Sequence, residues 1–76
     1  HFMNIQNFIQ EFSYIFEDTD ISILKPETSY LDLDEWDSMI SLATMAHFDE
    51  EFNIKIEPDF LFESNNFQEL YDKLNF

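Results

Sequence analysis

Six large aliphatic and aromatic residues recur at helical spacing near the start of the chain, and they constrain its fold more than any other feature. They are Ile5, Phe8, Ile9, Phe12, Ile15 and Phe16. Because successive residues of an α-helix turn by about 100°, these positions share one face. Asn4 stands directly before them and is a favoured N-cap. The spacing therefore predicts a helix from about Asn4 to Phe16 whose apolar face is buried in a core.

The rest of the sequence predicts three more helices. The second runs from Ser38 to about Phe52, with Asn53 as its C-cap, and a short third helix begins at Glu57-Pro58-Asp59 and ends near Ser64. The last helix begins at Asn66, where Glu69 makes a start that resembles a capping box, and ends at about Asn75.

The segment between Glu17 and Asp37 has no sustained period, but it is too apolar for a free linker. We expect a long loop that packs over the core, with one helical turn inside it. No strand pair and no Gly-rich loop occurs, since Gly is absent. The prediction is an all-α fold: a small four-helix bundle of three longer helices and one short one. We expect residues 4–76 to form a single domain, and residues 1–3 to be a cloning remnant (His1 and Phe2) followed by a start at Met3.

The composition of the chain excludes some kinds of site and some kinds of partner. With 76 residues there is room for one small core, and the absence of Cys rules out disulfides and thiolate metal sites. Seventeen acids against three Lys give a net charge of −14, which repels nucleic acids and anionic membranes. Such a surface suits basic protein partners, or it simply keeps a Phe-rich domain soluble. No apolar run reaches about 18 residues and no secretory signal is present, so we expect a cytoplasmic monomer.

The segment Leu31-Asp-Leu-Asp-Glu-Trp-Asp-Ser-Met39 could be a metal loop, a serine held for catalysis, or a helix start. A calcium loop that began at Asp32 would have Trp36 at its fifth position and Ala43 at its twelfth, where ligands are required, so we expect no metal site. His47 lies about 13 Å along the helix from Ser38, too far to act as its base. We therefore expect no catalytic residue and no enzyme activity. Ser38 or Asp37 caps the helix.

The second helix is predicted to have two faces. Its apolar arc, expected to pack in the core, comprises Met39, Leu42, Met45, Ala46, Phe48 and Phe52. The remaining face comprises Ile40, Ala43, Thr44, His47, Glu50 and Glu51. That face is mixed and small, which suits contact with another protein.

The segment Glu35-Trp-Asp-Ser-Met-Ile40 resembles the attachment motif of acyl carrier proteins and peptidyl carrier domains. The resemblance continues through the acidic end of the second helix and the last two helices. It implies that Ser38 receives 4′-phosphopantetheine from coenzyme A, through a phosphopantetheinyl transferase that uses a divalent metal. Asp37 and Met39 would flank the serine for recognition, with Met39 as an apolar anchor beneath it. Cargo would be carried as a thioester on the arm.

Departures from the family pattern shape the functional hypothesis. Glu35 stands where many fatty-acid carriers have Gly, and Ile40 and Ala43 stand where they have acids. We therefore expect a stand-alone acyl carrier of a specialised biosynthetic pathway. Its partners would be the transferase, a loading enzyme and acyl-transfer enzymes with basic docking patches. They would contact Ile40, Ala43, His47, Glu50 and Glu51. The alternatives are an aminoacyl or peptidyl carrier of the D-alanyl type and an unmodified acidic interaction module.

Overall fold

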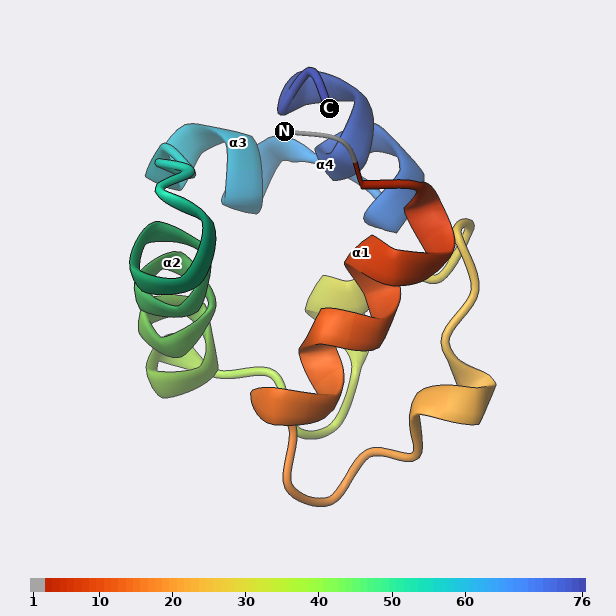
Figure 1. Ribbon diagram of the computed structural model, residues 1–76. Coiled ribbons are helices and arrows are strands. Elements are labelled where there is room, and N and C mark those ends of the chain that lie inside the picture. The colour runs from red at the N-terminus through yellow and green to blue at the C-terminus, as the bar shows by residue number, and fades with distance from the viewer. Residues whose placement is uncertain (1–2) are drawn as a thin grey trace.

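The computed structural model describes residues 3–76, whose four α-helices are joined by loops and short 3-10 turns (Figure 1). The first helix, α1 (Ile5–Glu11), continues directly into a 3-10 turn, η1 (Phe12–Tyr14). The others are α2 (Ser38–Phe52), α3 (Pro58–Glu63) and α4 (Phe67–Lys73). Residues 3–76 contain no strand, which confirms the predicted all-α bundle of four helices. Within this range, no helix has both the length and the apolar character needed to cross a membrane.

Acidic and amide side chains set where α1 and α2 begin. Asn4 accepts a hydrogen bond from the backbone N–H of Asn7 (2.7 Å), and Asp37 accepts one from the N–H of Ile40 (2.8 Å). Each bond satisfies an N–H group that has no partner within its helix. Asp37 is therefore the N-cap of α2, and Ser38 is its first helical residue.

Amide side chains also shape the end of α2 and the start of α4. Asn53 ends α2 in the left-handed region (φ 55°, ψ 36°), which Asn tolerates better than most residues in a chain that has no Gly. Asn66 caps α4 by accepting from the N–H of Glu69 (2.9 Å). The carboxylate of Glu69 in turn accepts from the N–H of Asn65 (2.9 Å), one residue earlier than in a standard capping box.

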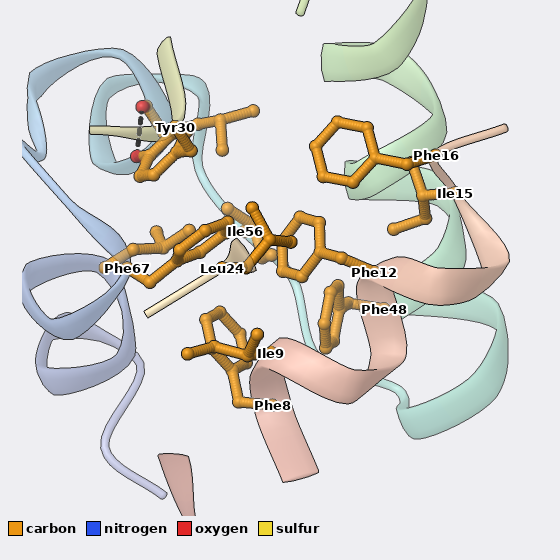
Figure 2. Close-up of a cluster of buried hydrophobic side chains, with 12 residues drawn as sticks. Phe8, Ile9, Phe12, Ile15, Phe16, Leu24, Tyr30, Phe48, Ile56 and Phe67 are labelled. Atoms are coloured by element: carbon orange, nitrogen blue, oxygen red, sulfur yellow. Dashed lines mark hydrogen bonds between the residues drawn. The ribbon is translucent and has the colours of Figure 1, made fainter. Parts of the chain in front are cut away.

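Phe12 lies at the centre of the core (Figure 2). Its fully buried ring is 5.0 Å from the ring of Phe67 on α4 and 5.8 Å from that of Phe48 on α2, measured between centroids. The ring of Phe8, one helical turn earlier, is 5.6 Å away. Aromatic side chains bury a large area each, so a few of them can join three short helices.

The long loop after α1 packs on the core, as predicted, but it contains two helical turns instead of one. They are η2 (Ile21–Ile23) and η3 (Tyr30–Asp32). Tyr30 is fully buried, and its hydroxyl donates to the backbone carbonyl of Leu61 in α3, the bond drawn in Figure 2. The ring of Trp36 lies 5.0 Å from that of Tyr30. These contacts hold the loop against the bundle.

The prediction for the faces of α2 is wrong in part. The sequence places Leu42 and Ala46 toward the core and Thr44 away from it. In the structure Leu42 is 61% exposed and Ala46 is exposed, whereas Thr44 is fully buried together with Ser41 and Phe48.

The reason is that two hydroxyl groups are satisfied within the helix itself. Ser41 Oγ donates to the carbonyl of Asp37 (3.1 Å), and Thr44 Oγ1 donates to the carbonyl of Ile40 (2.8 Å). A hydroxyl that bonds to the carbonyl four residues earlier needs no water, so burial costs it little. The inner side of α2 is therefore formed by Ser41 and Thr44 together with Phe48, while Met39 and Leu42 lie on its exposed side.

Hydrogen bonding also joins the two ends of the described chain. The hydroxyl of Tyr71 in α4 donates to the carbonyl of Met3, and its ring stacks on that of Phe76 at 5.2 Å. The expectation that His1 and Phe2 are a cloning remnant lies outside the described residues.

Candidate functional site

Ser38 is the first residue of α2, and its side chain is exposed. The preceding residue, Asp37, is extended (φ −150°, ψ −173°), so the chain turns into the helix at this pair. The helix has 15 residues, and its N-terminus carries the positive end of the helix dipole. A phosphate ester on the Ser38 hydroxyl would therefore lie where backbone N–H groups and the dipole stabilise negative charge.

Asp37 fixes the first turn of α2 around this serine. Its Oδ1 accepts from the N–H of Ile40 (2.8 Å), and its carbonyl accepts from the N–H of Ser41 (3.0 Å). Because both bonds span Ser38, they fix the backbone of the first turn at this residue.

Met39 does not lie beneath the serine, so its predicted role as an apolar anchor is wrong. Its side chain is 70% exposed. Met39 shares the outer face of α2 with Leu42, Ala43 and Ala46, at spacings of three and four residues, and all four are exposed. We call these four residues the α2 stripe. An exposed apolar surface of this kind is typical of a site of protein contact.

The predicted partner-contacting residues do not form one exposed surface. The sequence predicts five of them: Ile40, Ala43, His47, Glu50 and Glu51. Ile40 is partly buried against the core, and His47 is partly buried with its Nε2 2.8 Å from Glu11 Oε1 on α1. The other three are exposed. The partner role of all five stays a prediction.

Glu35 makes contacts that the sequence did not indicate. Its carboxylate accepts from the N–H of Glu17 (2.7 Å), the N–H of Asp18 (3.1 Å) and the hydroxyl of Thr19 (2.7 Å). We call these three bonds the Glu35 clasp. The bond from the Thr19 hydroxyl and those from the backbone lower the pKa of Glu35, against a smaller opposing effect of desolvation. The partners lie 16 to 18 residues earlier in the chain, so no local pattern could have revealed them.

Three exposed acids lie close to Ser38 in the sequence and make the surroundings of the serine negatively charged. Asp32, Asp34 and Asp37 are all exposed. Together with the net charge of −14, they oppose the approach of an anionic reactant. In the described part of the chain, no group of three or more carboxylate or imidazole side chains is placed to hold a metal ion.

The model of a family described as "Phosphopantetheine attachment site" matches residues 5–74, which is nearly the whole chain. No curated protein and no solved structure matches this chain.

Proposed function

The chain belongs to the phosphopantetheine attachment site family, whose members carry a covalent 4′-phosphopantetheine on a serine, and we propose that this serine is Ser38. The observation that carries the proposal is that Ser38 is exposed at the N-terminus of the longest helix. The residues present suit the group, because the helix end favours the phosphodiester and Ser38 is exposed at that end.

The other serines are poorer candidates. Ser41 and Ser64 are buried, and their hydroxyls donate to the carbonyls of Asp37 and Phe60. The remaining three are exposed but lie outside the four α-helices: Ser13, Ser22 and Ser29. Only Ser38 combines an exposed hydroxyl with the positive end of a long helix dipole.

The proposed modification is a phosphoryl transfer to oxygen. The Ser38 hydroxyl oxygen attacks the phosphorus of coenzyme A that carries the pantetheine, and its proton passes to a base of the transferase. A new Oγ–P bond forms, the P–O bond of the pyrophosphate breaks, and adenosine 3′,5′-bisphosphate leaves. The arm supplies the thiol on which cargo is held as a thioester. What this chain contributes is the position of the nucleophile, which Asp37 holds through its bonds across the first turn.

We infer that the protein is an acyl carrier of a specialised biosynthetic pathway and has no catalytic activity of its own. Carrier domains of this family are generally not catalysts; they interact with phosphopantetheinyl transferases and with enzymes that handle acyl groups. An aminoacyl or D-alanyl cargo is the alternative, and loading assays with an adenylating enzyme distinguish the two.

The α2 stripe is the surface that we propose for these partners. It begins at Met39, directly after the attachment serine, and runs along the outer face of α2. Exposed Glu50 and Glu51 follow it toward the end of the helix. A partner would need a shallow apolar surface for the stripe and basic residues for the acids, so its approach would be steered by charge and weakened by salt.

The test is modification of the purified protein. We would incubate it with coenzyme A, Mg²⁺ and a transferase of broad specificity, and record the intact mass. The expected result is a gain of one phosphopantetheinyl group by the wild type, none by Ser38→Ala, and full modification of a matched exposed-serine control, Ser29→Ala.

Two results would contradict the proposal. Modification that persists in Ser38→Ala would place the group on another residue. A folded wild type that accepts no group from several transferases would favour an unmodified interaction module, which binds its partner equally well after Ser38→Ala.

A further inference from the structure

We propose that Glu35 is a positioning residue for the modification of Ser38: the Glu35 clasp holds the segment before the serine in the conformation that a visiting transferase binds. This inference rests on the proposed function, because it concerns how Ser38 is presented to the transferase. Glu35 occupies the position at which the resemblance to fatty-acid carriers leads one to expect Gly, so the clasp is a feature of this chain's own sequence.

Two consecutive residues before the Asp37-Ser38 pair, Glu35 and Trp36, are each held by contacts with other parts of the chain. Glu35 bonds to the stretch from Glu17 to Thr19 through both of its carboxylate oxygens. Trp36 then packs its ring against Tyr30, at 5.0 Å, and against Phe16, at 6.1 Å. Asp37 and Ser38 follow directly. Ser38 therefore lies between α2, which begins at this residue, and the anchored pair Glu35-Trp36, which precedes Asp37.

The clasp also joins the two sides of a surface groove. The groove is open, has a volume of about 580 Å³, and is lined by residues 18–20 and 33–35 together with Ile23. Its acids are Asp18, Asp20, Asp34 and Glu35, and its apolar lining is Ile23 and Leu33. Because Glu35 bonds directly to Asp18 and Thr19, the relative position of the two sides depends on the clasp. We therefore expect the shape of this groove, whose lining residues all precede Ser38 in the sequence, to depend on the clasp.

At position 35 the carboxylate of Glu can accept all three hydrogen bonds of the clasp, whereas the amide of Gln cannot. The two oxygens of Glu35 accept from three donors, and two of these donors are backbone N–H groups. A Gln side chain has one acceptor oxygen, and its NH₂ group cannot accept a hydrogen bond. Glu35→Gln therefore loses at least one bond and sets a donor against a donor, with almost no change in side-chain volume.

Loss of the clasp has a specific kinetic consequence. The Ser38 hydroxyl and the Asp37 cap are unchanged, so the chemical step in the bound complex keeps its rate. The transferase must instead order the released segment when it binds, so KM for the carrier rises. We expect a rise of about tenfold, which corresponds to about 1.4 kcal/mol, with kcat within about twofold of the wild type.

The experiment compares three variants with the wild type as substrates of one transferase, with coenzyme A saturating. Glu35→Gln removes the charge and breaks the clasp. Asp34→Asn removes the same charge one residue earlier, outside the clasp, and so measures the effect of charge alone. Thr19→Val deletes one donor and leaves the charge intact. Amide NMR shifts of Glu17 and Asp18 report directly on whether the clasp is formed.

The expected result is a KM for Glu35→Gln about tenfold above that of Asp34→Asn, a smaller rise for Thr19→Val, and displaced amide signals of Glu17 and Asp18. Equal KM values for Glu35→Gln and Asp34→Asn would overturn the inference, as would a loss confined to kcat. Should Glu35→Gln fail to fold, Thr19→Val decides the question, because an unchanged KM in that variant refutes the positioning role. Failure of the proposed function looks different, since the wild type itself would then remain unmodified.

Discussion

Tyr30 offers a sharp test of how the long first loop is held to the bundle. Its hydroxyl is buried and donates to the carbonyl of Leu61 near the end of α3. Tyr30→Phe keeps the ring and removes only the hydroxyl, which leaves that carbonyl without this donor. We expect a loss of about 1–3 kcal/mol in the free energy of unfolding at pH 7. The whole free energy of unfolding of a domain of this length is roughly 4–11 kcal/mol, so the expected loss is a substantial fraction of its stability.

Alkaline pH provides a second measure of the same hydroxyl. Burial raises the pKa of Tyr30 from 10.0 to about 12. The folded state therefore binds this proton more tightly than the unfolded state does. The resulting stability is fully present below pH 10 and is lost as the pH rises from about 10 to 12. Such a shift in pKa corresponds to roughly 3 kcal/mol in the free energy of unfolding, which the wild type should lose and Tyr30→Phe should not.

The assay is urea unfolding at a series of pH values from 7 to 12, followed by the fluorescence of Trp36. This is the only Trp in the chain, and its ring lies 5.0 Å from that of Tyr30, so it reports on the loop itself. Tyr14→Phe is the matched control, because Tyr14 is 75% exposed. That variant should follow the wild type at every pH.

The difference in unfolding free energy between wild type and Tyr30→Phe is the decisive quantity, because contributions shared by the two proteins cancel in it. Parallel loss of stability in the two proteins between pH 10 and 12 would refute a buried, hydrogen-bonded hydroxyl. An equal effect of Tyr14→Phe would refute it as well.

Two further predictions concern the core and the surface charge. Phe12→Ala should cost about 3–5 kcal/mol in urea unfolding, because its fully buried ring contacts three helices, whereas Phe62→Ala, at a position 53% exposed, should cost less than about 1 kcal/mol; similar costs would contradict the assigned core. Raising the ionic strength from 0.01 M to 0.1 M should raise the melting temperature by about 4–8 °C, equivalent to about 1 kcal/mol, because the Debye length falls from about 30 Å to 10 Å and the repulsion among 17 acids is screened. A flat calorimetric response to salt would mean that repulsion among the acids is minor.

Local patterns in the sequence predict most of the helical structure. The N-cap at Asn4, the left-handed C-cap at Asn53 and the proline at the start of α3 all occur where short-range chemistry indicates. Each depends on interactions within about four residues, so the order of residues alone is enough to locate them. The position of Ser38 at the first turn of α2 follows from the same kind of local information.

The orientation of α2 could not be predicted in this way. Hydrophobicity places Leu42 inside and Thr44 outside, yet the structure has the reverse. Thr44 and Ser41 satisfy their hydroxyls within the helix, so their burial beside the core costs little. Which side of α2 is buried depends on where α1 and α4 pack, and local sequence patterns carry no information on that packing.

Chain order is enough to predict the four helices and the serine at the start of the longest one, because these depend on neighbours a few residues apart. The predicted end of the first helix, Phe16, is wrong, since the α-helix ends at Glu11 and a 3-10 turn follows. Two features became visible only in the folded protein: which side of α2 is exposed, and the Glu35 clasp that precedes Ser38. Those features depend on packing volumes and on hydrogen bonds between residues 16 or more positions apart, and chain order carries no direct record of such distances.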